Sequence, residues 1–174
     1  AMIGDDIAAV IFEPIQGVAG AYDLNIEFVE TLRAATTKHG AVLIADEVQS
    51  GIGRSGQFFA VRTMGIEPDI ISCAKALGGG VPCGAVVCGN DIARLFGLGA
   101  LGSTFGGGPL AAAAVVAVIK AIKDENLLHN VRAREAQIRE LCVVGPVNKI
   151  QGAGLLLGLV CDRPANEVRD FLLD

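Results

Sequence analysis

The chain has 174 residues, of which 52% are hydrophobic and 19% are charged, and its formal net charge is −5. Because no basic stripe is present to neutralise phosphates, we expect no nucleic-acid partner. The excess of apolar residues indicates a large buried sheet, a large oligomer interface, or a piece of a longer protein.

The cysteines and the apolar stretches narrow the class of protein further. The number of cysteines is odd and no C-x-x-C spacing occurs, so we expect reduced, buried thiols rather than a disulfide framework or a zinc site. The apolar stretch Ala111–Ile119 ends at Lys120, which is too short to span a bilayer, so we expect no membrane partner. No basic segment of a signal peptide is visible, and we expect a cytoplasmic location.

The first part of the chain alternates apolar runs with one amphipathic segment. Ile7–Phe12 is a short apolar run that predicts a buried strand. Asn25–His39 has apolar residues at helical spacing, an asparagine suited to cap its start and a glycine after its end, and predicts a helix. Ala41–Ala45 predicts a second buried strand. Gln49–Gly56 is rich in glycine and predicts a loop.

The later part of the chain continues the same alternation. Strands are predicted at 69–73, 84–87 and 152–161, and helices at 91–96, 110–125, 126–142 and 164–173. The helix over 110–125 is nearly all apolar, so we expect it to be deeply buried. Residues 97–109 form a second glycine-rich loop.

Alternating strands and helices, with strands that are apolar throughout, predict an α/β fold with a mostly parallel sheet covered by helices on both faces. In such sheets, ligands bind beyond the carboxyl ends of the strands. Asp46 and Lys75 each follow one of these ends. We therefore expect both side chains to face one crevice.

Lys75 lies between an apolar strand and a triple glycine. Because a lysine is costly to bury, this placement favours a chemical role, of which a Schiff base with a carbonyl cofactor is the best known. A surface lysine after an edge strand is the alternative. Asp46 could keep the ring nitrogen of pyridoxal phosphate protonated, or it could simply be a solvated or helix-capping aspartate at a strand end.

Several neighbours of these two residues could contribute to the same site, although each has a simpler alternative. Val48 could pack on a cofactor ring or be an ordinary core residue, and Gln49 could bind a ring hydroxyl or occupy a turn. Ser103 and Thr104 offer two hydroxyls in a glycine-rich turn that could hold a phosphate or only connect two elements. Glu13 could enter the crevice or end a strand.

Five ordered motifs together resemble the class III aminotransferases of the acetylornithine, ornithine and 4-aminobutyrate type, which have the pyridoxal-phosphate fold type I. They are Glu-Pro-Ile-Gln-Gly at 13–17, Ala-Asp-Glu-Val-Gln-Ser-Gly-Ile-Gly-Arg-Ser-Gly at 45–56, Pro-Asp-Ile-Ile at 68–71, Ala-Lys-Ala-Leu-Gly-Gly-Gly at 74–80 and Gly-Ser-Thr-Phe-Gly-Gly-Gly-Pro at 102–109. Five motifs in order are far more specific than one glycine-rich match. The resemblance extends from about residue 7 to the end.

The resemblance implies a role for each matching residue. It implies that Lys75 forms the Schiff base, that Asp46 pairs with the ring nitrogen, and that Glu47, Val48, Gln49 and Thr104 complete the cofactor site. Thr104 would serve the site of a neighbouring subunit, with Ser103 near the substrate there, so the active unit would be a homodimer. Glu13 would be a structural or substrate-side carboxylate. Residues 1–140 would belong to the cofactor-binding large domain and 141–174 to the start of a small domain.

The implied activity is transfer of an amino group from an amino acid to a 2-oxo acid. Three positions depart from the family pattern, namely Val18, Leu101 and Gly108, and Val18 leaves the amino donor open. Val48 and Gln49 place the chain nearer the transaminases than the decarboxylases or aminomutases of the same family. The family's upstream phosphate-binding pair and downstream arginine are not in this chain. A truncated, non-catalytic domain that dimerises without cofactor is therefore the rival hypothesis.

Overall fold

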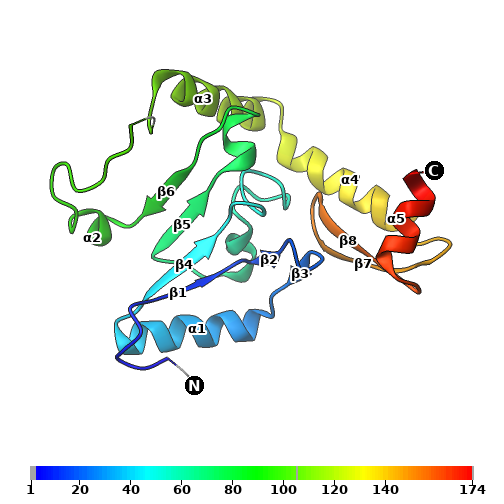
Figure 1. Ribbon diagram of the computed structural model, residues 1–174, viewed down its shortest axis with the longest axis horizontal. Helices are drawn as coiled ribbons and strands as arrows, with labels where there is room; N and C mark the ends of the chain where they lie inside the picture. The colour runs from blue at the N-terminus through cyan, green and yellow to red at the C-terminus, as the bar shows by residue number, and fades with distance from the viewer. Residues whose placement is uncertain (1–2, 105, 174) are drawn as a thin grey trace.

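The computed structural model describes residues 3–104 and 106–173, and its centre is a four-stranded sheet (Figure 1). The strand order is β1 (Ala9–Phe12), β4 (Val42–Asp46), β5 (Ile70–Cys73) and β6 (Ala85–Cys88). The first three strands are parallel and β6 is antiparallel to β5. The predicted α/β fold with a mostly parallel sheet is confirmed.

Helix α1 (Ile26–His39) connects β1 to β4 and packs against both strands. The side chain of Asn25 accepts a hydrogen bond from the amide of Phe28, and Gly40 ends the helix in the left-handed conformation, as the sequence predicted. Val29 and Leu43 are fully buried where the helix meets the sheet, in a cluster with Phe12, Ala45, Val61 and Met64. This cluster fixes β1 and β4 side by side.

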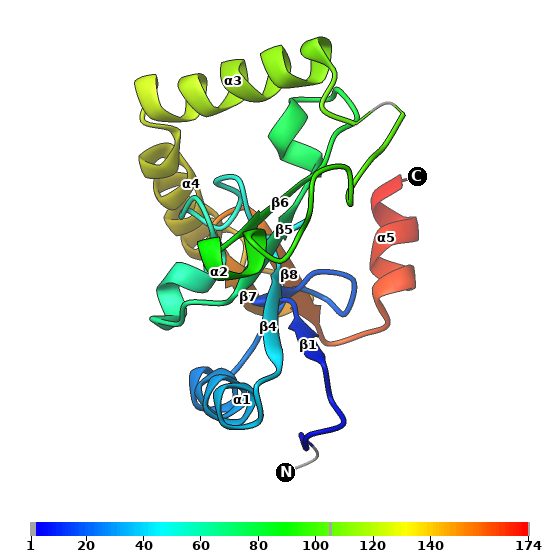
Figure 2. The same cartoon turned by 90° about the vertical axis from the view of Figure 1, so that its left-hand side faces the viewer.

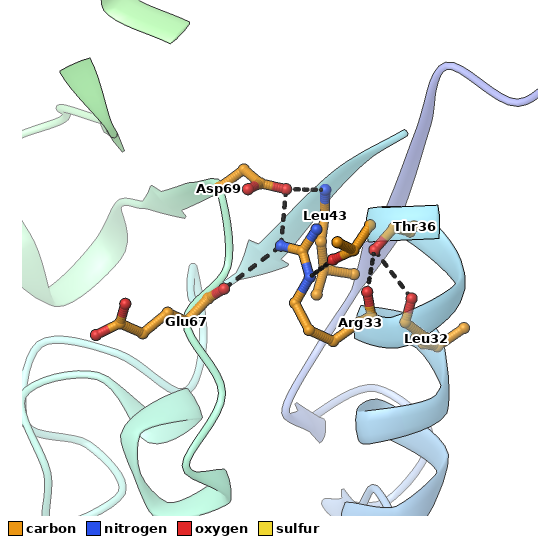
Figure 3. A network of polar contacts seen from close by, with 7 residues as sticks. Leu32, Arg33, Thr36, Leu43, Glu67 and Asp69 are labelled. Carbon is orange, nitrogen blue, oxygen red and sulfur yellow. Dashed lines mark hydrogen bonds and ion pairs between the residues drawn. The ribbon is translucent and has the colours of Figure 1, made fainter. Parts of the chain in front are cut away.

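A second contact between α1 and the sheet is polar (Figure 3). The Asp69 carboxylate accepts hydrogen bonds from the Leu43 amide at 2.7 Å and from the Arg33 guanidinium at 2.9 Å. Asp69 directly precedes β5, whereas Leu43 lies in β4. One carboxylate therefore joins α1, β4 and β5 and helps to set the register in which Asp46 stands beside Ser72.

The chain after β6 forms a short helix α2 (Asn90–Ala93), then α3 (Pro109–Asp124) and α4 (Leu127–Leu141). The prediction that α3 is deeply buried is wrong, because none of its residues is buried and Leu110 is 75% exposed. Only the side that carries Val115, Val118 and Ile122 packs on the protein. It covers the short helix η2 (Lys75–Gly78), so α3 lies at the opposite end of the molecule from α1 (Figure 2).

The last part of the chain is a β-hairpin followed by α5 (Ala165–Leu173). The single strand predicted at 152–161 is wrong, because β7 (Val147–Ala153) and β8 (Leu156–Cys161) are two antiparallel strands. The reversal at Gly154 has a left-handed backbone that the sequence pattern did not reveal. The domain boundary near residue 140 remains a prediction.

Three smaller elements complete the described chain. The strands β2 (Ile15–Gln16) and β3 (Tyr22–Asp23) form a small antiparallel pair, and η1 (Ala60–Met64) is a short helix between β4 and β5. Within residues 3–104 and 106–173, the helices are all too short or too polar to cross a bilayer.

Candidate active site

The ends of β4 and β5 bring the two main candidate residues to one edge of the sheet. Asp46 is the last residue of β4 and pairs with Ser72 of β5, and Lys75 begins η2 two residues after β5 ends. The chain turns away directly after Asp46, where the amide of Glu47 donates to the Ser72 carbonyl at 2.9 Å. Asp46 stands at the carboxyl end of one parallel strand and Lys75 just beyond that of the next, as expected for a ligand site.

The Asp46 carboxylate is partly buried and held from one side. Its Oδ1 accepts a hydrogen bond from the Val48 amide at 3.0 Å and another from the Ser72 hydroxyl at 3.0 Å. A carboxylate oxygen with two donors has a restricted orientation, which leaves the second oxygen in a defined direction. The arrangement suits a carboxylate that must meet one particular atom of a ligand.

Lys75 has an unusual backbone and an accessible side chain. Its φ of 47° lies in the left-handed region, which costs a residue other than glycine about 1 kcal/mol. The buried Leu77 and Gly78 follow it and fix η2, so the surrounding structure determines this conformation. The sequence led us to expect an enclosed, apolar site, but the Lys75 side chain is exposed in this chain.

Lys75 lines a cavity of about 480 Å³ together with Val48 and Gln49, but not with Asp46, which the sequence predicted to face the same crevice. The other lining residues are Arg54, Ala76, Gly79, Gly80, Leu155 and Leu156. Asp46 does not line this cavity itself but is hydrogen-bonded to Val48, which does. The cavity therefore has an amine, an amide side chain and an apolar wall, and Val48 connects it to the held carboxylate of Asp46.

Leu155 and Leu156 are lining residues that sequence reasoning missed. They belong to the tip of the β7–β8 hairpin, which approaches the loop after β4 so that the Leu155 amide donates to the Arg54 carbonyl at 2.8 Å. No local pattern marks them, because an apolar residue in a hairpin looks the same wherever it packs. Arg54 did have a signal, since it is a charged residue in a glycine-rich loop near Asp46.

The Glu47 side chain points into the core, and the contact with a cofactor that the sequence predicted for this residue stays a prediction. It is fully buried, with one oxygen accepting from the Ser50 hydroxyl at 2.6 Å and the other from the Val61 amide at 2.7 Å. Both oxygens are thus used inside the protein. This orientation arises because the chain turns after Asp46, so the next side chain points into the core and holds the following loop against η1.

The remaining predicted residues, Glu13, Ser103 and Thr104, are not among the lining residues of this cavity. Glu13 accepts a hydrogen bond from the Gly17 amide at 3.2 Å and so closes a turn. This turn lies so near Gln49 that a Cβ atom on Gly17 would overlap the Gln49 side chain. Ser103 and Thr104 are exposed on the loop before α3 and are not among the cavity-lining residues. The structure does not bring them to Lys75 of the same chain.

Cys73 lies directly before this site and is almost completely buried in the cluster that includes Ile52 and Leu77. Burial raises the pKa of its thiol, an effect that hydrogen bonding with the backbone of Ala85 partly offsets. A thiol of this kind is a poor nucleophile at neutral pH. Its role here is packing beneath Lys75, in agreement with the small core residue that the sequence predicted.

The sequence profile of the aminotransferases of class III matches residues 1–173. The chain belongs to this family. Similar curated relatives include the acetylornithine aminotransferases of Corynebacterium efficiens, with 45% identity over 91% of this chain, and Methanopyrus kandleri, with 46% identity over 90%. The chain spans only 40% and 41% of the lengths of these two relatives.

Solved structures agree with this family membership. The acetylornithine aminotransferase from Elizabethkingia anophelis superposes with a TM-score of 0.85 at 34% identity, over 97% of this chain and 43% of that one. The ornithine aminotransferase from Toxoplasma gondii superposes with a TM-score of 0.83 at 32% identity, over 91% of this chain and 39% of that one. This class III chain therefore has the fold of fold type I aminotransferases over most of its length.

Proposed function

We propose that the protein containing this chain is a pyridoxal-phosphate-dependent aminotransferase that moves an amino group from an amino acid to a 2-oxo acid. The observation that carries the proposal is that Lys75, Val48 and Gln49 line one cavity beside the held carboxylate of Asp46. The family membership supports it. Of the acetylornithine, ornithine and 4-aminobutyrate donors that the sequence left open, relatives named acetylornithine and ornithine aminotransferases favour the first two.

The cavity fits the cofactor chemically. Bound pyridoxal phosphate would supply an aldehyde for the lysine amine and a ring that withdraws electrons from the substrate carbon. Lys75 has an accessible amine, and Val48, Leu155 and Leu156 give the cavity an apolar wall on which a ring could pack. Gln49 has both a donor and an acceptor for a ring hydroxyl.

Each of these residues has a distinct task in the proposed reaction. The Lys75 amine would hold the aldehyde of the cofactor and, when free of it, would move a proton to and from the substrate carbon. The Asp46 carboxylate would hold a proton at the ring nitrogen. Val48 and Gln49 orient the ring, and the apolar wall limits access of water to the reacting carbon.

The exposed loop with Ser103 and Thr104 supports the part of the proposal that concerns a second subunit. Because these hydroxyls are not at the cavity of their own chain, we assign them to the site of a partner in a homodimer, with Thr104 at the cofactor phosphate and Ser103 near the substrate. The turn that Glu13 closes at Gly17 lies against the Gln49 side chain, so we assign Glu13 a structural role beside Gln49. Light scattering of the natural polypeptide would give the mass of two chains if the dimer forms.

Borohydride reduction of the natural polypeptide with pyridoxal phosphate, followed by peptide mass spectrometry, tests the catalytic assignment. We expect a pyridoxyl adduct on Lys75 and a loss of transamination of at least about 100-fold in Lys75→Ala. Lys120→Ala, which removes another exposed lysine, is the matched control and should retain activity. An adduct elsewhere, or none, would refute the assignment and favour a non-catalytic domain. Release of carbon dioxide or an isomerised product would instead indicate a decarboxylase or an aminomutase.

A further inference from the structure

Ser72 is the residue of β5 that lies directly beside Asp46. The two are paired in the parallel register of β4 and β5, and their side chains lie on the same side of the sheet, where the Ser72 hydroxyl donates to Asp46 Oδ1 at 3.0 Å. The Ser72 carbonyl also accepts from the amide of Glu47, the residue that follows Asp46. Ser72 thus holds both the carboxylate and the turn that carries it.

The hydrogen bonds around Asp46 are unevenly divided between its two oxygens. Oδ1 accepts from the Ser72 hydroxyl and from the Val48 amide, and across residues 3–104 and 106–173 we find no donor on Oδ2. Two donors on one oxygen restrict rotation of the carboxylate and leave the lone pairs of Oδ2 for a ligand. A strand position between Ile71 and Cys73 would otherwise favour an apolar, β-branched residue. The hydroxyl is therefore best explained by its contact with Asp46.

We propose that Ser72 is a positioning residue for the aminotransferase reaction, which orients the Asp46 carboxylate so that Oδ2 meets the cofactor ring nitrogen. The inference rests on the function proposed above. Of the two donors on Oδ1, the Val48 amide belongs to the backbone and persists in any variant of residue 48 other than proline. The Ser72 hydroxyl is the donor that a substitution can remove.

The test compares Ser72→Ala with Ser72→Thr, which retains a hydroxyl, in the natural polypeptide reconstituted with pyridoxal phosphate. For Ser72→Ala we expect cofactor binding to weaken about 10-fold, which corresponds to about 1.4 kcal/mol. The pH at which the absorbance of the bound cofactor is half changed should rise. With Asp46 less well placed, the ring nitrogen would carry less positive charge, and the linkage to Lys75 would then hold its own proton up to a higher pH. Ser72→Thr should restore both values to within about 2-fold of wild type.

Ser50→Ala is the control for a purely structural effect. It removes a buried hydroxyl that binds Glu47 rather than Asp46, so it should lower the melting temperature without moving the pH midpoint. Equal shifts of the pH midpoint in Ser72→Ala and Ser50→Ala would overturn the role of Ser72 but not the proposed function. The same conclusion would follow if Ser72→Ala left the pH midpoint unchanged while the wild-type protein bound the cofactor on Lys75. A wild-type protein without an adduct on Lys75 would overturn the proposed function and this inference with it.

Discussion

Replacement of Glu47 should show that this carboxylate holds the site together rather than binding a ligand. Glu47→Ala leaves the Val61 amide and the Ser50 hydroxyl buried without their partner, after hydrogen bonds of 2.7 Å and 2.6 Å have been lost. Each buried group that loses its partner costs about 1–3 kcal/mol, so we expect the free energy of unfolding to fall by about 3–5 kcal/mol. This is a large share of the stability of a typical domain.

Glu47→Gln should cost much less, and the comparison makes the prediction specific. The glutamine oxygen can accept from the Val61 amide, and its NH₂ group can donate to the Ser50 hydroxyl, which rotates to become an acceptor. We therefore expect a loss of about 1 kcal/mol, because the same two contacts persist as neutral hydrogen bonds.

Urea unfolding of the apo-protein followed by circular dichroism measures both losses. Equal losses in Glu47→Ala and Glu47→Gln would refute the explanation by hydrogen bonding. If Glu47→Ala lowered the free energy of unfolding by less than about 1 kcal/mol, the buried hydrogen bonds of Glu47 would not be a source of stability. If Glu47→Gln bound the cofactor more weakly at unchanged stability, the result would instead support the contact between Glu47 and the cofactor that the sequence predicted.

Two further predictions concern the hairpin tip and the thiol beneath Lys75. Gly154→Ala should lower the free energy of unfolding by about 3 kcal/mol, because the new Cβ would overlap the Arg54 carbonyl and the residue would also be strained in the left-handed conformation. Gly145→Ala is the control: it has the same backbone strain but open space around the new Cβ, so it should cost about 1 kcal/mol. Equal melting temperatures of these two variants would contradict the close packing of the tip. The raised pKa of Cys73 keeps its thiol protonated in the folded state at a pH where the same thiol ionises in the unfolded chain. The free energy of unfolding should therefore fall as pH rises above about 8.5, and Cys73→Ala should reduce that fall. Urea midpoints at neutral and alkaline pH measure this, and an undiminished fall in the variant would exclude Cys73 as its cause.

Much of the fold could be predicted because its signals are local. The helix from Ile26 to His39 has its cap, its periodicity and its terminal glycine within a few residues of one another, and all three agree with the structure. The strands β4 and β5 are short apolar runs followed by polar residues at the edge where ligands bind.

Two predictions failed, for different physical reasons. An apolar helix is buried only if something covers both of its sides, and α3 has a covering cluster on one side alone, formed by residues distant in the sequence. The hairpin depends on the left-handed turn at Gly154, a conformation that glycine permits but does not require, so the apolar pattern alone predicted one continuous strand.

The sequence by itself determined the family, the order of the strands that carry Asp46 and Lys75, and the chemical types of their side chains, because motifs and periodicity are written in neighbouring residues. Only the tertiary structure decided which groups surround them. It placed the Ser72 hydroxyl on Asp46, buried Glu47 in the core, and brought Leu155 of a distant hairpin to the wall of the cavity. These outcomes depend on strand register and packing between segments far apart in the chain, which no local pattern encodes.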